Sequence, residues 1–413
     1  MSGIRTSPPG RALLASRAMA LGPTTRPQRP DVAFFLPHLG GGGVERVVLN
    51  LINGLSARGH VVELVLMQAT GALLADLPSH VHVVDLRLRG PHEVVFGFAL
   101  PGLARYLRAH RPRILYSGMT SINAVAIVAR ALANVDTRVV VSEHVPPSVN
   151  VRTHVLKRPL PLVIRSAYPH ADAIVAVAGA LADDLANVGR LPRDTIDVVY
   201  NPAVDDALLS QAVRDPGHPW LVADVPVLLG VGRLTPQKDF GTLIEAFALV
   251  RRDRAARLVI LGEGPDRAAL EAQARRLGVS EDVSMPGFSA VPAAFMARAS
   301  VFVSSSAYEG LAMALMEALA CGCPCVSTDC LTGPQEILDG GRYGPLVPVG
   351  DAAALALAIM QTMDAPLPRD VLRTRGMAFS VDRSVAAYEA LFERLASTGR
   401  RAAHVEPRLA RRS

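Results

Sequence analysis

Two glutamates in the second half of the chain have the spacing and surroundings of ligand-binding residues. Glu309 stands in Tyr308-Glu309-Gly310-Leu311, and Glu317 follows eight residues later. That separation corresponds to ~12 Å along a helix, which suits contact with two parts of one extended ligand better than acid–base work on one atom. A carboxylate among the apolar neighbours of Glu317 needs a hydroxyl or a cation as partner. The alternative is that both glutamates lie on a solvated helix face.

Two cations precede a predicted helix in the same half of the chain. Gly232-Arg233 follows an apolar run at 227–231, and Lys238 precedes the amphipathic segment 239–250. The planar guanidinium of Arg233 and the compact charge of Lys238 suit a diphosphate. Ordinary surface cations are the alternative.

Glycines follow three of the predicted strands. Gly40, Gly41, Gly42 and Gly43 lie between the first strand and the first helix, where backbone N–H groups suit phosphate. The segment matches neither G-x-G-x-x-G nor the P-loop, and a plain tight turn is its alternative. In Leu261-Gly262-Glu263-Gly264-Pro265, the glycines would let a base or ribose approach the backbone.

Short apolar runs alternate with amphipathic ones from Asp31 onward. The helix at 44–55 is the strongest case, because its apolar residues recur with helical spacing. The alternation predicts a first doubly wound α/β domain. Its predicted strands are 32–36, 61–67, 80–84, 114–116, 139–141, 173–178 and 196–200, and its helices are 44–55, 122–133 and 180–188.

A second alternation follows a polar, proline-containing connection at 201–226. Its predicted strands are 227–231, 258–261, 283–285, 301–304, 324–327 and a short one near Leu346, and its helices are 239–250, 266–277, 291–297, 311–320, 352–363 and 381–395. The fold class is therefore α/β, with two facing Rossmann-like domains around a cleft. The predicted parts are a basic disordered tail (1–29), an N-terminal domain (30–204), a C-terminal domain (205–375), a helix packing back toward the N-terminal domain (376–397) and a basic tail (398–413).

The charge distribution and the apolar runs limit the kinds of partner that this protein could bind. The net charge is +6, with arginines concentrated in both terminal segments. Aromatic residues do not interleave with these arginines and no nucleic-acid-binding motif occurs, so we expect no nucleic acid as partner. No apolar run approaches the ~20 residues that span a bilayer, and we expect a cytoplasmic protein.

A segment with mixed basic and apolar character lies at 151–168. It contains Arg152, Lys157, Arg158 and Arg165 among apolar residues, and prolines break it. This composition favours peripheral contact with an anionic membrane, on its inner face, and with a lipid-linked acceptor. An ordinary protein surface is the alternative.

All four cysteines lie within ten residues, at Cys321, Cys323, Cys325 and Cys330. Their spacing lacks the paired C-x2-C pattern of zinc sites and no histidine is nearby, so they are predicted to be core residues.

Several blocks together resemble family 4 of the nucleotide-sugar glycosyltransferases, retaining enzymes of the GT-B type. The resemblance runs from about Asp31 to Leu395, and its most specific parts are Gly-Arg-Leu with Lys-Asp-Phe at 232–240, Leu-Gly-Glu-Gly-Pro at 261–265 and the E-x7-E pair Glu309 and Glu317. Independent blocks in this order are far more specific than any one of them.

The resemblance implies roles for individual residues. Glu309 would bind hydroxyls of the transferred sugar, Glu317 would bind the ribose, and Arg233 with Lys238 would hold the diphosphate. His144, in Ser142-Glu143-His144, resembles a histidine placed near the donor sugar. The remaining implied donor contacts are Gly41, Gly42, Gly43, Gly232, Gly262, Glu263, Gly264, Gly310 and Leu311.

The implied reaction transfers a hexose or N-acetylhexosamine, with retention, from a nucleotide sugar to a glycan or lipid-linked acceptor in surface polysaccharide synthesis. A UDP-sugar is favoured as donor. Stabilising the leaving phosphate would carry the catalysis. The chain contains no D-x-D pair, so neither a metal nor another cofactor is expected.

Three other functions remain open on the sequence. A nicotinamide oxidoreductase lacks support, because the G-x-G-x-x-G signature is missing. A non-catalytic protein that binds nucleotide sugars is disfavoured by the intact Arg233, Lys238, Glu309 and Glu317. A sugar synthase with a soluble acceptor would share the fold and the donor site.

Overall fold

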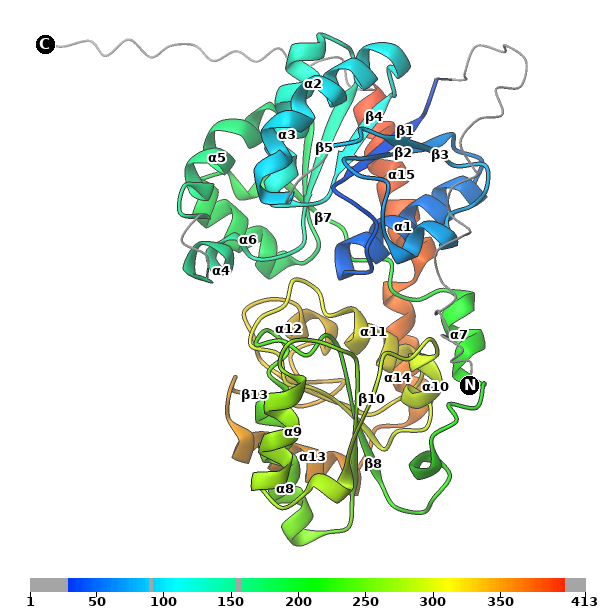
Figure 1. The fold of residues 1–413 in the computed structure, drawn as a ribbon, viewed down its shortest axis with the longest axis vertical. Coiled ribbons are helices and arrows are strands. Elements are labelled where there is room, and N and C mark those ends of the chain that lie inside the picture. Colours follow the sequence, from blue (N-terminus) through cyan, green and yellow to red (C-terminus); the bar gives the residue numbers. More distant parts are fainter. Residues whose placement is uncertain (1–28, 89–91, 154–156, 398–413) are drawn as a thin grey trace, which may run out of the picture.

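The structure, a computed structural model, describes residues 29–88, 92–153 and 157–397. Figure 1 shows two α/β units, one above the other, each with a central sheet between helices. Apart from Arg29, the predicted basic tails lie outside the described residues, as does part of the segment 151–168.

The first unit is built on a seven-stranded parallel sheet with the order β3-β2-β1-β4-β5-β6-β7. Most of its strands are continuous apolar runs, as burial on both faces requires. The strands are β1 (Val32–Leu36), β2 (Val62–Leu66), β3 (His82–Asp85), β4 (Ile114–Ser117), β5 (Arg138–Glu143), β6 (Ala173–Ala176) and β7 (Ile196–Val198). Its helices are α1 (Gly43–Ala57), α2 (His92–His110), α3 (Thr120–Ala133), α4 (Pro147–Thr153), α5 (Leu160–Ala167) and α6 (Gly179–Gly189).

The second unit repeats this arrangement in a six-stranded parallel sheet with the order β10-β9-β8-β11-β12-β13. The strands are β8 (Val227–Val231), β9 (Arg257–Leu261), β10 (Val283–Gly287), β11 (Val301–Ser304), β12 (Cys325–Thr328) and β13 (Leu346–Val347). The helices that follow the connection after β7 are α7 (Asp206–Ala212), α8 (Phe240–Asp253), α9 (Arg267–Arg276), α10 (Pro292–Met296), α11 (Met313–Ala320), α12 (Pro334–Ile337), α13 (Ala352–Asp364), α14 (Arg369–Gly376) and α15 (Val381–Ser397).

In both sheets the first strand lies inside the sheet, the next two strands are added on one side of it, and the chain then returns to add the remaining strands on its other side. All strands stay parallel, and only the order in which they are added reverses. The reversal lies between β1 and β4 in the first sheet and between β8 and β11 in the second. Ligands of such sheets bind beyond the carboxyl ends of the strands at this point. The predicted fold class is confirmed.

The chain crosses between the two units twice, side by side. The amides of Ala203 and Val204 both donate to the carbonyl of Phe379, and the amide of Val381 donates to the carbonyl of Val204. After the second crossing, α15 runs along α1 in the upper unit of Figure 1. Gly54 makes room for this packing, since a Cβ there would lie 2.5 Å from Val385 Cγ2.

Six α-helices of the described residues lie outside the predicted helical segments: α2, α4, α5, α7, α12 and α14. Helix α2 contains Pro101 and helix α14 is strongly polar, so neither shows a simple apolar stripe. Helix α7 lies within the polar, proline-containing connection between the predicted domains, where Asp205 caps it by accepting from the amide of Leu208. Helix α11 starts two residues later than predicted, at Met313.

The four cysteines are buried core residues, as predicted. Burial raises the pKa of the Cys323 thiol to about 12, so it stays protonated. Among the described residues, no helix is both long and apolar enough to cross a membrane.

Candidate active site

Two loops meet at the reversal point of the second sheet. One follows β8 and contains Gly232, Arg233 and Lys238; the other follows β11 and contains Glu309. Strands β8 and β11 are parallel neighbours, so both loops leave the sheet at the same edge. This topology explains why residues 71 positions apart lie together.

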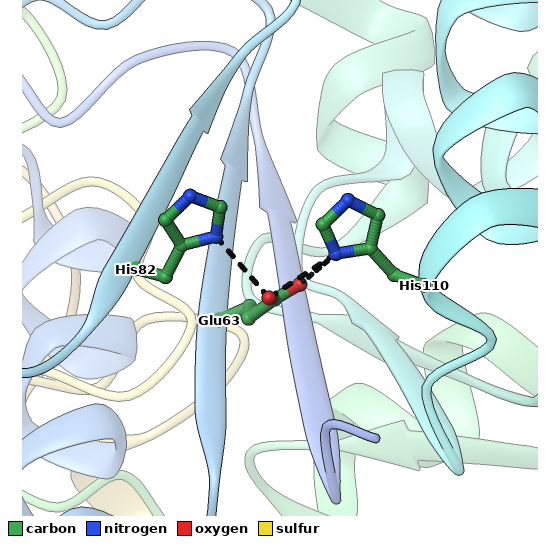
Figure 2. A group of neighbouring side chains, drawn as sticks. All are labelled: Glu63, His82 and His110. Atoms are coloured by element: carbon green, nitrogen blue, oxygen red, sulfur yellow. Dashed lines mark hydrogen bonds and ion pairs between the residues drawn. The ribbon is translucent and has the colours of Figure 1, made fainter. Parts of the chain in front are cut away.

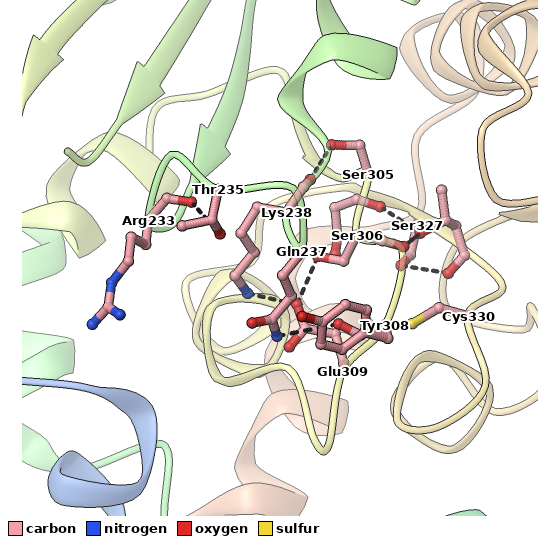
Figure 3. Close-up of polar contacts among 12 residues, drawn as sticks. Arg233, Thr235, Gln237, Lys238, Ser305, Ser306, Tyr308, Glu309, Ser327 and Cys330 are labelled. Atoms are coloured by element: carbon pink, nitrogen blue, oxygen red, sulfur yellow. Dashed lines mark hydrogen bonds and ion pairs between the residues drawn. The ribbon is translucent and has the colours of Figure 1, made fainter. Parts of the chain in front are cut away.

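Lys238 and Glu309 form an ion pair at this point. The Nζ–Oε1 distance is 2.5 Å, and Ser306 Oγ donates to the same carboxylate oxygen at 2.6 Å (Figure 3). The Glu309 side chain is only 7% exposed, against 23% for Lys238. A carboxylate so buried needs its charged partner, so the lysine fixes the position of Glu309.

Hydrogen bonds hold the two loops together around this pair. Ser305 Oγ donates to the carbonyl of Lys238 at 2.9 Å, and Gln237 Nε2 donates to the carbonyl of Tyr308 at 3.2 Å. The Thr332 hydroxyl donates to the carbonyl of Glu309. The pair is therefore held in a rigid frame, which suits ligand positioning.

Arg233 differs from Lys238 in having no partner. Its side chain is exposed and forms no ion pair with any residue in the described part of the chain. Figure 3 shows its guanidinium directed away from the Lys238–Glu309 pair. Arg233 is thus the cation of this edge that is free to meet an anionic ligand.

Glu317 lies in α11, where charged residues of both units act on it. Its side chain keeps some contact with solvent, yet desolvation raises its pKa to about 7. Arg46 from α1 of the first unit and Lys238 oppose this rise, and Asp205 adds to it. A carboxylate in this environment favours a hydroxyl or cation as partner.

His144 lies at the end of β5, against the second unit. A Cβ on Gly310 would lie 1.7 Å from the carbonyl oxygen of His144, so only glycine allows this contact. The imidazole Nε2 is 3.3 Å from Tyr116 Oη and 3.2 Å from Ser142 Oγ, whereas the buried Nδ1 has no partner among the described residues. Burial lowers the pKa of His144 to about 4, so the ring is neutral near pH 7.

The glycine loop at 40–43 leads into α1 as expected, but a carboxylate lies at the helix start. A Cβ on Gly42 would lie 2.5 Å from Glu45 Oε2, and Glu45 Oε1 is 3.6 Å from His38 Nδ1. Glu45 therefore already interacts with the positive end of α1. A phosphate at this loop would have to displace it, while Gly41 and Gly43 leave open space.

The glycines after β9 have a packing role in addition to the one inferred from the sequence. A Cβ on Gly262 would lie 1.9 Å from the carbonyl oxygen of Gly232, and one on Gly264 would lie 2.2 Å from that of Leu234. Close packing against the loop after β8 therefore requires both glycines. Glu263 between them is exposed and pairs with Arg267 at 2.6 Å.

Two family sequence models match the chain. One, described as Glycosyltransferase Family 4, matches residues 41–206, and the other, described as Glycosyl transferases group 1, matches residues 225–365. The matches cover most of both units. The chain belongs to the family 4 type glycosyltransferases.

One relative that matches most of the chain and another that matches about half of it agree with this assignment. An N-acetylgalactosamine-N,N'-diacetylbacillosaminyl-diphospho-undecaprenol 4-alpha-N-acetylgalactosaminyltransferase of Campylobacter jejuni is 29% identical over 378 residues, covering 87% of this chain and 98% of that protein. The lipopolysaccharide core biosynthesis glycosyltransferase LpsE of Rhizobium meliloti is 40% identical over 218 residues, or 51% of this chain and 59% of LpsE.

Solved structures share the fold. The apo form of the lipopolysaccharide outer core galactosyltransferase WaaB aligns with a TM-score of 0.69 and 20% identity, covering 88% of this chain and 99% of that chain. Anabaena HepE in complex with UDP and glucose aligns with a TM-score of 0.72 and 20% identity, covering 89% of this chain and all of that one. The prediction of a nucleotide-sugar glycosyltransferase is confirmed.

The structure adds residues that the sequence reasoning missed in this glycosyltransferase. Arg46 approaches Glu317 from the opposite unit. Glu336 of the second unit accepts hydrogen bonds from the amides of Gly179 and Ala180 at 2.9 Å, at the start of α6. Arg46 was detectable as a cation just inside the helix that follows the glycine loop. Glu336 carries no such signal in the sequence.

Proposed function

We propose that this glycosyltransferase retains anomeric configuration and needs no metal, and that it transfers an N-acetylhexosamine or hexose from a UDP-sugar to a lipid-linked glycan in surface glycan synthesis. The observation that carries the proposal is the Lys238–Glu309 ion pair at the reversal point, with Arg233 in the same loop as Lys238 and without an ion-pair partner among the described residues. The Campylobacter relative, whose name specifies an undecaprenol-linked acceptor, supports the acceptor class.

The leaving diphosphate needs positive charge in this cleft. Lys238 is partly neutralised by Glu309, so Arg233 supplies the unpaired cation and Lys238 supplies a second donor beside it. Preorganised donors aimed at developing charge are the main source of catalysis where no protein nucleophile is used. In this role Lys238 bridges the sugar-binding carboxylate and the phosphate, coupling the positions of both.

The two carboxylates take different parts of the donor. Glu309, held by Lys238 and Ser306, accepts hydrogen bonds from sugar hydroxyls, and Glu317 accepts them from the ribose. Neutral His144 adds a hydrogen bond from its unpartnered Nδ1 to the sugar when Nε2 accepts from a neighbouring hydroxyl.

A pocket of about 490 Å³ supports an acceptor with an apolar chain. Val151, Pro161 and Val188 of the first unit line it together with Ser148, Arg152 and Asp184, and Leu331 lines it from the second unit. Leu331 adjoins Thr332, which donates to the carbonyl of Glu309. The pocket is thus mainly apolar, with one arginine, and its Leu331 adjoins a residue that contacts the Glu309 backbone; such a lining suits the lipid part of an acceptor.

The donor test is thermal stabilisation by UDP-, GDP- and ADP-linked sugars in the presence of EDTA. We expect a UDP-sugar to raise the melting temperature of the wild type and to have no effect on Glu317→Ala. Glu393→Ala, on the exposed face of α15, is the matched control and keeps the response. Unchanged stabilisation of Glu317→Ala would remove Glu317 from the donor site, and stabilisation that needs Mg²⁺ would remove metal independence.

The reaction test is transfer to an undecaprenyl-diphosphate-linked saccharide, with the product analysed by proton NMR. We expect an α-linked product from an α-linked donor. A β-linked product would refute retention, and a protein that binds donor without transferring to any acceptor would refute the enzyme assignment. Transfer only to soluble acceptors would favour a sugar synthase.

A further inference from the structure

Two histidines and a glutamate meet in the first unit, away from the cleft. Glu63 comes from β2, His82 from β3 and His110 from the last residue of α2 (Figure 2). In the described part of the chain this is the only group of three or more His, Cys, Asp or Glu side chains whose possible ligand atoms all lie within 4.8 Å of one another. The sequence contains no motif that predicts this cluster, because the three residues are 19 and 28 positions apart along the chain.

The two histidine–carboxylate distances in this cluster fit ligands of one ion, and all three ligand atoms lie within 4.8 Å of one another. His82 Nδ1 is 3.2 Å from Glu63 Oε1, and His110 Nδ1 is 3.0 Å from Glu63 Oε2. A tetrahedral ion with bonds of about 2.0–2.1 Å holds its ligand atoms ~3.3 Å apart. Figure 2 shows both rings turning Nδ1 toward the same carboxylate.

Neighbouring groups hold the ligands in place. The Glu63 side chain is 8% exposed, and Tyr106 Oη donates to its Oε2 at 2.5 Å. The Tyr106 and His110 rings stack with centroids 4.5 Å apart, which orients the imidazole. A hydrogen bond that orients a ligating carboxylate is a usual feature of metal sites. The 61% exposure of the His82 side chain leaves a side open to water.

We propose that Glu63, His82 and His110 bind a divalent transition-metal ion of the Zn²⁺ class, with water completing the shell. Imidazole and carboxylate ligands suit this class rather than Mg²⁺ or Ca²⁺, which prefer all-oxygen shells. Glu63 and His82 lie near the starts of their strands, whereas the cleft lies beyond the strand ends. The ion ties the end of α2 to the edge of the sheet and takes no part in donor binding.

The test is Zn²⁺ binding by calorimetry on the untagged full chain after chelator treatment. We expect one saturable Zn²⁺ per chain with a rise in melting temperature, and no comparable effect of MgCl₂. His82→Asn should abolish saturable binding, because it removes an exposed ligand without disturbing the core. His80→Asn, an exposed histidine two residues away, is the matched control and should bind as the wild type does.

Two further measurements separate metal binding from loss of folding. Tyr106→Phe keeps all three ligands but removes the hydrogen bond to Glu63, and should weaken binding about tenfold. Co²⁺ in place of Zn²⁺ should give a visible spectrum typical of four ligands in the wild type and not in His82→Asn. Absence of stoichiometric binding to the wild type, or equal binding by wild type and His82→Asn, would overturn the proposal.

Discussion

Replacing Glu317 by glutamine tests the electrostatics of the cleft, because the change keeps the shape and removes the ionisable group. Desolvation raises the pKa of Glu317 to about 7 in the folded protein, from an ordinary value of 4.5. Between these two pH values the folded state holds a proton that the unfolded state has released. The contribution of Glu317 to stability is therefore present at low pH and is lost as pH rises toward 7.

The size of the effect follows from the same two values. Ionising Glu317 in the folded protein costs about 2–3 kcal/mol, after allowance for the solvent that reaches its side chain. Glu317→Gln should thus stabilise the ligand-free protein by about 2–3 kcal/mol at about pH 8.5, and by less than about 0.5 kcal/mol at about pH 4.5. This gain in stability is expected in the ligand-free protein even though the variant loses the proposed contact with the ribose of the nucleotide sugar.

Urea unfolding of wild type and variant at these two pH values measures the difference. Glu393→Gln, on the exposed face of α15, serves as the control and should change stability by less than about 0.5 kcal/mol at either pH. A gain of equal size at both pH values, or destabilisation at the higher one, would refute the reasoning. An equal gain would mean that ionisation of Glu317 is not its cause, and destabilisation at the higher pH would mean that Arg46 compensates the burial of the charge.

Three further predictions concern contacts in and across the cleft. Lys238→Met should destabilise the protein by about 2–3 kcal/mol, since it leaves the Glu309 carboxylate buried without its cation. Adding Glu309→Gln should recover most of that loss in urea unfolding, and strict additivity would contradict the ion pair. Gly310→Ala should lower donor affinity at least tenfold in calorimetry, because its Cβ would overlap the carbonyl oxygen of His144 and force the units apart. Unchanged affinity would show that this contact is dispensable. Glu336→Ala should cost about 1 kcal/mol and speed amide exchange at the start of α6, where the carboxylate accepts two amide hydrogen bonds; unchanged exchange there would count against it.

The fold was predictable because it depends on local patterns. The apolar stripe of α1 and the short apolar runs of β1 and β8 recur along the chain, so a doubly wound arrangement could be inferred twice. Helix α2 escaped prediction because Pro101 interrupts it, and proline normally marks the end of a helix. Tertiary packing, which the sequence pattern does not display, decided in favour of the helix there.

The candidate site was predictable as a set of residues but not as a set of contacts. Lys238 and Glu309 were both expected at strand ends, yet their ion pair depends on β8 and β11 being neighbours. Gly262 was expected to admit a ligand, whereas the structure requires it for loop packing. The order of the strands in the sheet decides which strand ends are neighbours, and no single segment of the sequence determines that order.

The sequence by itself determined the two α/β units, the family resemblance and the residue types at the cleft, because these follow from local periodicity and short motifs. Only the tertiary structure decided which of those residues meet. Arg46 approaches Glu317, and Glu63 lies between His82 and His110, because sheet topology brings together residues that are far apart along the chain. The physical reason is that burial and charge pairing are properties of three-dimensional neighbours, and the chain specifies neighbours only through the fold as a whole.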